Sequence, residues 1–162
     1  MHGQYDLLLS KLLAACRQHY GARLVSVAVL GSVGRGTPHP DSDLDLLIVA
    51  DGLPDGRLAR ARDFQAVETA LGPSLAEAHA AGLDPDLSPA FKTPAEVELG
   101  SLLFLDLIDD ARLLDDRENF LRDMLASFQE RLWRFGARRI WRGNAWILDL
   151  KPDYTIGEVF EL

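Results

Sequence analysis

Two short apolar segments joined by a loop rich in glycine and proline place the strongest constraint on how this chain can fold. The first segment covers residues 24–30 and the second covers residues 43–50, with three glycines and two prolines between them. Aliphatic runs of this length, bounded by turn residues, favour β-strands. Because the connection is too short for a crossover helix, the two strands are predicted to pair antiparallel.

Two aspartates open the second strand. Side chains alternate between the faces of a strand, so Asp43 and Asp45 lie on one face and Leu44 lies on the other. Two carboxylates this close repel each other, and a bound cation relieves the repulsion. A small set of hard oxygen ligands beside a phosphate suits Mg²⁺, which keeps several waters and takes further ligands from phosphate oxygens. The pattern therefore predicts a magnesium site.

The loop before these aspartates has the residues that a phosphate site needs. Gly31 allows the backbone to approach a ligand closely, and Ser32 offers a hydroxyl and an N–H group. Arg35 lies between two glycines, where its guanidinium can bind phosphate oxygens in a bidentate manner. The alternative interpretation is a plain hairpin with a flexible glycine loop and two solvated carboxylates.

The residues of this hairpin resemble the signature of nucleotidyltransferases of the DNA polymerase beta superfamily: Gly31-Ser32, Arg35-Gly36 and Ser42-Asp43-Leu44-Asp45-Leu46. The spacing is most similar to that of the short prokaryotic members called minimal nucleotidyltransferases. The resemblance implies transfer of a nucleoside monophosphate, most often AMP from ATP, to a hydroxyl group with release of pyrophosphate. It implies that Mg²⁺ is bound by Asp43 and Asp45. It further implies that the nucleotide and its phosphates are bound by Gly31, Ser32, Arg35 and Ser42.

Members of the superfamily also carry a third carboxylate on a neighbouring strand. The apolar run 101–109 is predicted as the third main strand, with Phe104, Asp106 and Ile108 on one face. A carboxylate inside such a strand is unfavourable unless it is paired or metal-bound. By the resemblance, Asp106 holds a second metal ion and helps to deprotonate the acceptor hydroxyl in a two-metal arrangement. The alternatives are a charge that protects a sheet edge, and Asp109 as the third ligand.

Most of the remaining segments have helical periodicity or capping signals. A strand that can lie at a sheet edge is predicted over residues 87–91, and Thr93-Pro94-Ala95-Glu96 is typical of the start of a short helix. Longer helices are predicted over residues 5–20, 57–71, 73–81 and 117–135. The expected fold class is therefore α/β (α+β), the nucleotidyltransferase fold with a small mixed sheet flanked by helices.

A single domain is expected over residues 1–162. Its core is predicted to cover about residues 5–135, followed by a C-terminal arm or hairpin over residues 136–162. That arm either contacts a partner or packs back on its own domain. Its start is part of a basic segment: Arg131, Arg134, Arg138, Arg139 and Arg142. These arginines are either ordinary charges near a helix C-terminus or a contact for an acidic or phosphate-bearing partner.

Composition argues against several classes of protein. A formal charge of −8 argues against broad, non-specific binding of nucleic acid. No segment resembles a signal peptide or a membrane span. The single cysteine, Cys16, cannot form an intrachain disulfide. We therefore expect the protein to be cytoplasmic and the Cys16 thiol to have a packing role.

The acceptor is the open part of the functional prediction. Short members of the family often act beside a small helical partner of the HEPN type, a ribonuclease toxin, which some of them adenylylate on tyrosine. The resemblance therefore favours an antitoxin-like enzyme that AMPylates a HEPN-type partner. One alternative is a non-catalytic antitoxin module that acts by contact alone. Another is a small-molecule enzyme of the aminoglycoside type, with a homodimer completing its substrate pocket.

Overall fold

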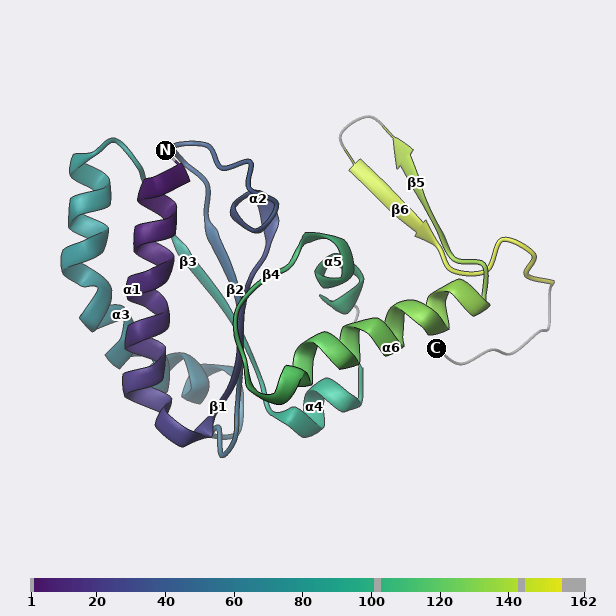
Figure 1. Cartoon of the computed structure of the whole chain (residues 1–162), viewed down its shortest axis with the longest axis horizontal. Helices are drawn as coiled ribbons and strands as arrows, with labels where there is room; N and C mark the ends of the chain where they lie inside the picture. Colours follow the sequence, from purple (N-terminus) through teal and green to yellow (C-terminus); the bar gives the residue numbers. More distant parts are fainter. Residues whose placement is uncertain (1, 101–102, 143–144, 156–162) are drawn as a thin grey trace.

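Four strands form one mixed sheet at the centre of the fold: β1 (Leu24–Val29), β2 (Leu44–Ala50), β3 (Leu87–Lys92) and β4 (Arg112–Asp116) (Figure 1). Their order in the sheet is β3-β2-β1-β4. As predicted, β1 and β2 pair antiparallel. β3 lies parallel to β2 at one edge, and β4 lies antiparallel to β1 at the other edge. The computed structural model describes residues 2–100, 103–142 and 145–155.

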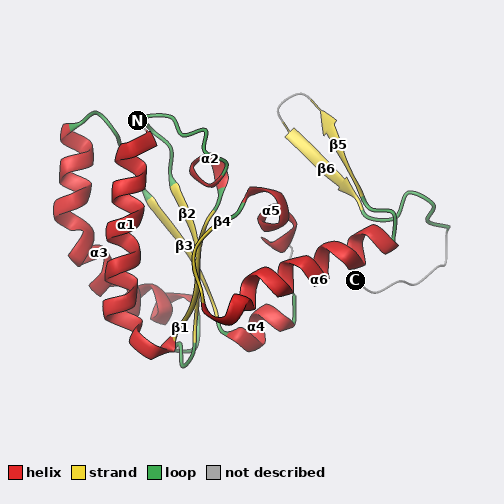
Figure 2. Ribbon diagram, in the orientation of Figure 1, coloured by secondary structure: helices red, strands yellow, loops and turns green. Residues whose placement is uncertain are grey.

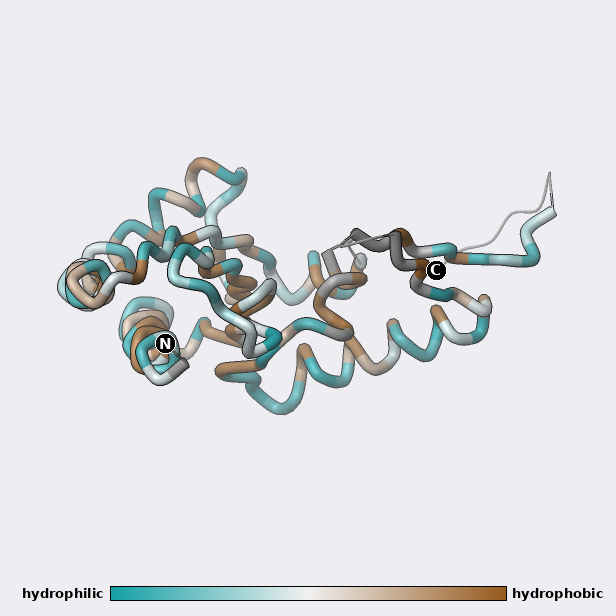
Figure 3. Tube along the Cα trace, turned by 90° about the horizontal axis from the view of Figure 1, so that it is seen from above, coloured by the Kyte–Doolittle hydropathy of each residue, from teal (hydrophilic) through white to brown (hydrophobic). Residues whose placement is uncertain are grey.

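Helices cover both faces of this sheet and confirm the expected fold class (Figure 2). One face is covered by α1 (His2–Tyr20) and α3 (Arg57–Ala80), and the other by α4 (Pro94–Glu98), α5 (Leu103–Asp110) and α6 (Phe120–Arg134) (Figure 1). Alternate residues of β2 enter the two cores: Leu46 packs on the side of α1 and α3, and Leu47 on the side of α5 and α6. Apolar segments accordingly lie between the two helical layers (Figure 3).

One face of α1 supplies a large part of the first core. Its buried side chains follow the predicted helical spacing: Tyr5, Leu8, Leu9, Leu12 and Cys16. Burial raises the pKa of the Cys16 thiol to about 12. The thiol therefore stays protonated and inert at neutral pH, which agrees with the packing role expected from the sequence.

The structure corrects the prediction of two helices over residues 57–71 and 73–81. These residues form one continuous helix, α3, with Pro73 inside it. A proline inside a helix lacks the N–H group of the regular ladder, so the sequence favours a break. Burial on both sides of the proline, at Leu71 and Ala78, places both halves of the helix against the same core, and this packing keeps the helix continuous.

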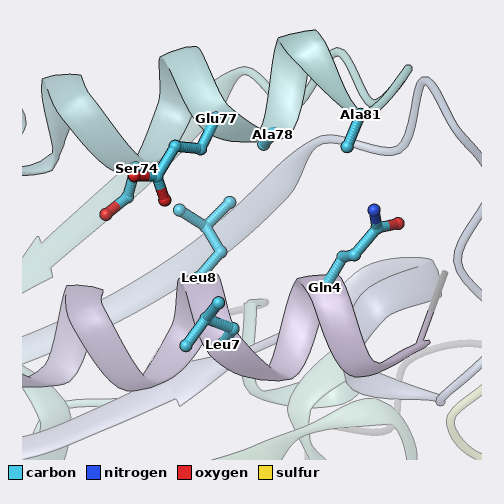
Figure 4. Close-up of a pocket in the computed structure, with 7 residues that line it drawn as sticks. All are labelled: Gln4, Leu7, Leu8, Ser74, Glu77, Ala78 and Ala81. Atoms are coloured by element: carbon cyan, nitrogen blue, oxygen red, sulfur yellow. The ribbon is translucent and has the colours of Figure 1, made fainter.

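A small opening separates α1 from the C-terminal half of α3. It has a volume of about 170 Å³ and is lined by Gln4, Leu7, Leu8, Ser74, Glu77, Ala78 and Ala81 (Figure 4). Leu8 points from α1 into the space, whereas the short side chains of Ala78 and Ala81 leave it unfilled (Figure 4). None of the predicted site residues lines this opening.

The prediction of a third main strand over residues 101–109 is wrong. Residues 103–110 form the helix α5, and the strand that completes the sheet is β4, which follows it. An uninterrupted apolar run fits the period of a strand and that of a helix equally well. In the structure the helical spacing prevails, because Phe104 and Leu107 are both buried in the second core.

The short helix α4 begins with the predicted capping box. The Glu96 N–H donates to Thr93 Oγ1 at 3.2 Å, and the Thr93 N–H donates to the Glu96 carboxylate at 2.8 Å. Arg60 of α3 donates to both oxygens of this carboxylate, at 2.7 and 3.0 Å. The hydrogen bond from Arg60 is the main cause that lowers the pKa of Glu96 to about 2.

We expect Glu96→Gln to be less stable than the native chain at pH 7, and the difference to narrow as the pH falls. The folded pKa lies below the unfolded value, so the ion pair stabilises the fold fully above about pH 4.5 and loses its effect as the pH drops towards 2. The Glu96 side chain is 36% exposed, so solvent screening limits the effect to about 1 kcal/mol. Urea unfolding at pH 7 and pH 3 measures it, with the exposed Glu98→Gln as control. A difference that stays constant with pH would contradict this interpretation.

The helix α6 is shorter than predicted at its N-terminus. Residues 117–119 form a 3-10 turn, in which Glu118 and Asn119 have positive φ. The carboxylate of Asp116 caps the helix by accepting hydrogen bonds from the N–H groups of Leu121 and Arg122, at 2.9 and 3.0 Å. Among the described residues, no helix is long and apolar enough to cross a membrane.

After α6 the strands β5 (Arg138–Arg142) and β6 (Ala145–Asp149) form a separate antiparallel hairpin (Figure 1). Three arginines of the basic segment have partners within the chain. Arg134 pairs with Glu130 at 2.6 Å, Arg138 pairs with Asp149 at 3.4 Å, and Arg131 lies over the Phe128 ring at 5.5 Å. The side chains of Arg139 and Arg142 lie outside the described part of the structure. Contacts within the chain therefore account for three of the five arginines of this segment.

Candidate functional site

The glycine-rich loop begins with a single helical turn, α2 (Gly31–Gly34), directly after β1. The Gly34 N–H donates to the Leu30 carbonyl and the Arg35 N–H to the Gly31 carbonyl, each at 3.0 Å. The sequence predicts an irregular loop here, since a four-residue turn has too few residues to show a helical period. The turn holds Gly31 and Ser32 at the end of β1, beside the start of β2.

Gly31 lies directly against the carboxylate of Asp45. A Cβ atom at Gly31 would lie 2.7 Å from Asp45 Oδ2, and the φ angle of Gly31 is +64°. Both facts require glycine, because other residues rarely adopt this angle and their side chain would displace the carboxylate. The Leu30 N–H also donates to the Asp45 carbonyl at 2.8 Å, so the two strands hold this contact in register.

The two aspartates occupy the positions that the strand pattern predicts. Asp43 and Asp45 are exposed, whereas Leu44 and Leu46 are buried in the core beneath them. This alternation places both carboxylates on one face at the N-terminal end of β2, where solvent and ligands can approach them. The Gly-Ser turn and the aspartate strand meet at Asp45.

A third carboxylate at this end of the sheet was missed by the sequence analysis. β3 is parallel to β2 with Leu87 beside Leu44 and Ser88 beside Asp45, and the Leu44 N–H donates to the Asp86 carbonyl at 2.8 Å. The same register, continued by one residue, sets Asp86 beside Asp43. The available signal was the acidic residue just before the predicted edge strand, but the sequence does not reveal which strand it pairs with.

Asp106 was placed in the site because its segment was predicted to be a strand next to β2. That prediction is wrong, since the backbone of Asp106 belongs to the helix α5. The side chains of Asp106 and of the alternative ligand Asp109 lie outside the described part of the structure. In the residues that are described, no group of three His, Cys, Asp or Glu side chains is arranged to hold a metal ion.

Ser32 and Ser42 are brought together although ten residues separate them. The Ser32 hydroxyl donates to the Ser42 hydroxyl at 2.8 Å, and the His39 N–H donates to the same Ser42 oxygen at 2.8 Å. Ser42 is only 8% exposed. Its hydroxyl thus holds Ser32 and the intervening loop, and Ser32 is the more accessible of the two for a ligand.

Arg35 is paired within the chain and does not point freely into solvent. Its guanidinium donates to the Asp110 carboxylate at 2.7 Å, with the arginine side chain 47% exposed and the aspartate 15% exposed. Gly34 makes this approach of α5 to α2 feasible. A Cβ atom at Gly34 would lie 2.5 Å from the Asp110 carbonyl oxygen and 2.6 Å from that of Val29. The C-terminus of α5 therefore packs tightly on the Gly-Ser turn.

The chain is similar to known proteins. The model of the family described as "Nucleotidyltransferase domain" matches residues 9–103. A curated relative from Methanocaldococcus jannaschii, named "Putative protein adenylyltransferase MJ1305", is 29% identical over 120 residues, which cover 73% of this chain and 76% of that protein.

Two of the solved structures to which the chain is similar are described as toxin–antitoxin complexes. One is a toxin–antitoxin with AMP-PNP, at 19% identity and a TM-score of 0.45, covering 79% of this chain and 92% of that chain. Another is a tri-AMPylated Shewanella oneidensis HEPN toxin in complex with MNT antitoxin, at 17% identity and a TM-score of 0.45, covering 84% of this chain and 93% of that chain. The family match covers more than half of the sequence and includes the Gly-Ser turn, both aspartates and β3, and so the chain belongs to the nucleotidyltransferase domain family.

Proposed function

We propose that this protein transfers a nucleoside monophosphate, with ATP as the favoured donor, to a hydroxyl acceptor and releases pyrophosphate. The observation that carries the proposal is the contact of Gly31 with the Asp45 carboxylate, with Asp43 on the same face and Ser32 next along the turn. A carboxylate pair beside a serine hydroxyl fits a triphosphate and its cation. Family membership supports the same class of reaction.

The donor set fits Mg²⁺. Asp43 and Asp45 offer exposed carboxylate oxygens on one face, and Mg²⁺ in nucleotide sites takes one or two carboxylates together with waters and phosphate oxygens. Asp86, which the continued strand register sets beside Asp43, is a further carboxylate at this end of the sheet, although these three described side chains are not arranged to hold a metal ion in the structure. When bound, the ion supplies charge neutralisation at the phosphates.

The remaining residues bind and orient the nucleotide. The Ser32 hydroxyl, held by Ser42, donates to a phosphate oxygen when Ser42 takes over as donor in their shared hydrogen bond, because hydroxyl protons rotate freely. Arg35 exchanges the Asp110 carboxylate, to which it donates one hydrogen bond, for a phosphate group, which offers two anionic oxygens for bidentate pairing with a guanidinium. Positioning and charge stabilisation by these groups then account for the protein's part in the reaction.

For the acceptor we propose a hydroxyl on a protein. The Methanocaldococcus relative is named as a protein adenylyltransferase, and it covers 73% of this chain. The resemblance to minimal nucleotidyltransferases makes a small helical protein of the HEPN type the specific candidate. In this proposal the chain acts as an antitoxin that modifies its partner.

Melting temperatures with ATP, GTP, CTP and UTP, each with and without Mg²⁺, test the donor site. A ligand at about a hundred times its dissociation constant stabilises a protein by about 2.7 kcal/mol, which is about 6–10 °C for a chain of this length. We expect the largest shift with ATP and a requirement for Mg²⁺. Transfer of label from α-³²P-ATP to the partner then tests the acceptor. The absence of any Mg²⁺-dependent shift would overturn the proposed donor site.

A further inference from the structure

The loop 35–43, which links α2 to β2, is held from outside by one buried tyrosine. The Tyr5 hydroxyl, on α1, lies 2.9 Å from the His39 carbonyl oxygen and 3.0 Å from the Ser42 carbonyl oxygen. The Tyr5 side chain is only 2% exposed, and its ring belongs to the first core. A rigid helix thus donates a hydrogen bond to a loop more than 30 residues away in the sequence.

The two residues that Tyr5 contacts are the ones that fix Ser32. The Ser42 hydroxyl oxygen accepts from the His39 N–H and from the Ser32 hydroxyl, both at 2.8 Å. The chain of contacts therefore runs from Tyr5 through the backbone of His39 and Ser42 to the hydroxyl of Ser32. A second hydrogen bond that holds the loop comes from Asp84, whose N–H donates to the Pro40 carbonyl at 2.7 Å.

The protonation of the Tyr5 hydroxyl keeps it available as a hydrogen-bond donor. Burial raises the pKa of its phenol above the ordinary value, and the negative charges of Asp41 and Asp43 raise it further. The hydroxyl therefore keeps its proton throughout the neutral range. The same two charges indicate that the phenol lies close to the candidate metal-binding end of β2.

We infer that Tyr5 is a positioning residue for nucleotidyl transfer, which acts through His39 and Ser42 to hold the Ser32 hydroxyl next to Gly31, the residue that lies against the Asp45 carboxylate. This inference rests on the proposed function and extends it to a residue far from the motif in sequence. Within this loop the Ser42 N–H donates to the His39 carbonyl at 3.1 Å, and Tyr5 contacts the carbonyl oxygens of the same two residues, so the phenol hydroxyl anchors this turn to α1. Loss of the phenol hydroxyl loosens Ser32 without altering any group that touches the nucleotide.

The substitution Tyr5→Phe tests this directly, because it removes the hydroxyl and keeps the ring. Tyr20→Phe is the matched control: Tyr20 lies on the same helix and is equally buried, and its hydroxyl has no hydrogen-bond partner among the described residues. We expect kcat/KM for Mg-ATP to fall about ten-fold in Tyr5→Phe, as one lost positioning hydrogen bond implies. We expect it to stay unchanged in Tyr20→Phe.

Two further readouts separate positioning from a general loss of stability. Amide hydrogen exchange without nucleotide should be faster over residues 36–43 in Tyr5→Phe and unchanged in Tyr20→Phe. The kinetic effects of Tyr5→Phe and Ser42→Ala should be non-additive, because both break the same chain of contacts. Equal kinetics for the two Tyr→Phe variants, or unchanged exchange in the loop, would overturn the inference. A native chain that transfers no nucleotide would instead show that the proposed function is wrong.

Discussion

Asp45→Asn is expected to abolish nucleotidyl transfer while leaving the fold intact. The substitution keeps the shape of the side chain but removes the charge that a cation at this site requires. We expect the rate of pyrophosphate release to fall by about a thousand-fold or more, as is typical when a group that stabilises transition-state charge is lost. Because Asp45 is exposed, the free energy of unfolding should change by about 0.5 kcal/mol or less.

The matched control for this variant is Asp41→Asn. Asp41 is an exposed aspartate of the preceding loop and its removal changes the net charge by the same amount. If both variants lose activity equally, the effect belongs to the electrostatic field of the loop and not to a ligand at Asp45. Full activity in Asp45→Asn would remove the aspartate pair from the mechanism altogether. Addition of Mg-ATP should raise the melting temperature of Asp41→Asn and leave the melting temperature of Asp45→Asn unchanged.

Gly31→Ala is expected to damage both stability and activity. The left-handed backbone at this position, with φ of +64°, disfavours alanine by about 1–2 kcal/mol. The new methyl group must also displace Asp45 Oδ2, which lies 2.7 Å from the Cβ position. A displacement of this kind at a catalytic group lowers kcat by about a hundred-fold.

Gly36→Ala separates these two effects. Gly36 has a similar φ of +73°, but a Cβ atom there meets no atom within 4 Å. Both variants should therefore lose stability through the backbone, as measured by urea unfolding, while only Gly31→Ala should lose activity by the larger factor. Equal activity losses in the two variants would show that the contact with Asp45 has no role in catalysis.

The features that the sequence predicts well are those that local pattern determines. The alternation of Asp43, Leu44, Asp45 and Leu46 places two carboxylates on one face whatever the rest of the chain does, and a short connection forces β1 and β2 to be antiparallel. The capping box at Thr93 and Glu96 is likewise complete within four residues. For this reason the predicted positions of the β1–β2 hairpin and of the start of α4 agree with the structure.

The features that the sequence does not predict depend on partners that are distant along the chain. The apolar run around Asp106 fits the side-chain period of a strand and that of a helix. Only the burial of Phe104 and Leu107 against α6 and the sheet selects the helix. Asp86 is set beside Asp43 by a parallel register with β2, which no local signal specifies. The pairing of Arg35 with Asp110 follows from the helix α5, so the wrong strand prediction concealed this contact as well.

The buried thiol of Cys16 has a practical consequence for experiments on this enzyme. It is the only cysteine of the chain, it is fully buried, and its high pKa keeps it unreactive towards maleimides at neutral pH. A fluorescent or spin label can therefore be attached to one new surface cysteine without removing the native one. Thr37 is an exposed position on the loop held by Tyr5, and a probe there would report how that loop moves as nucleotide binds.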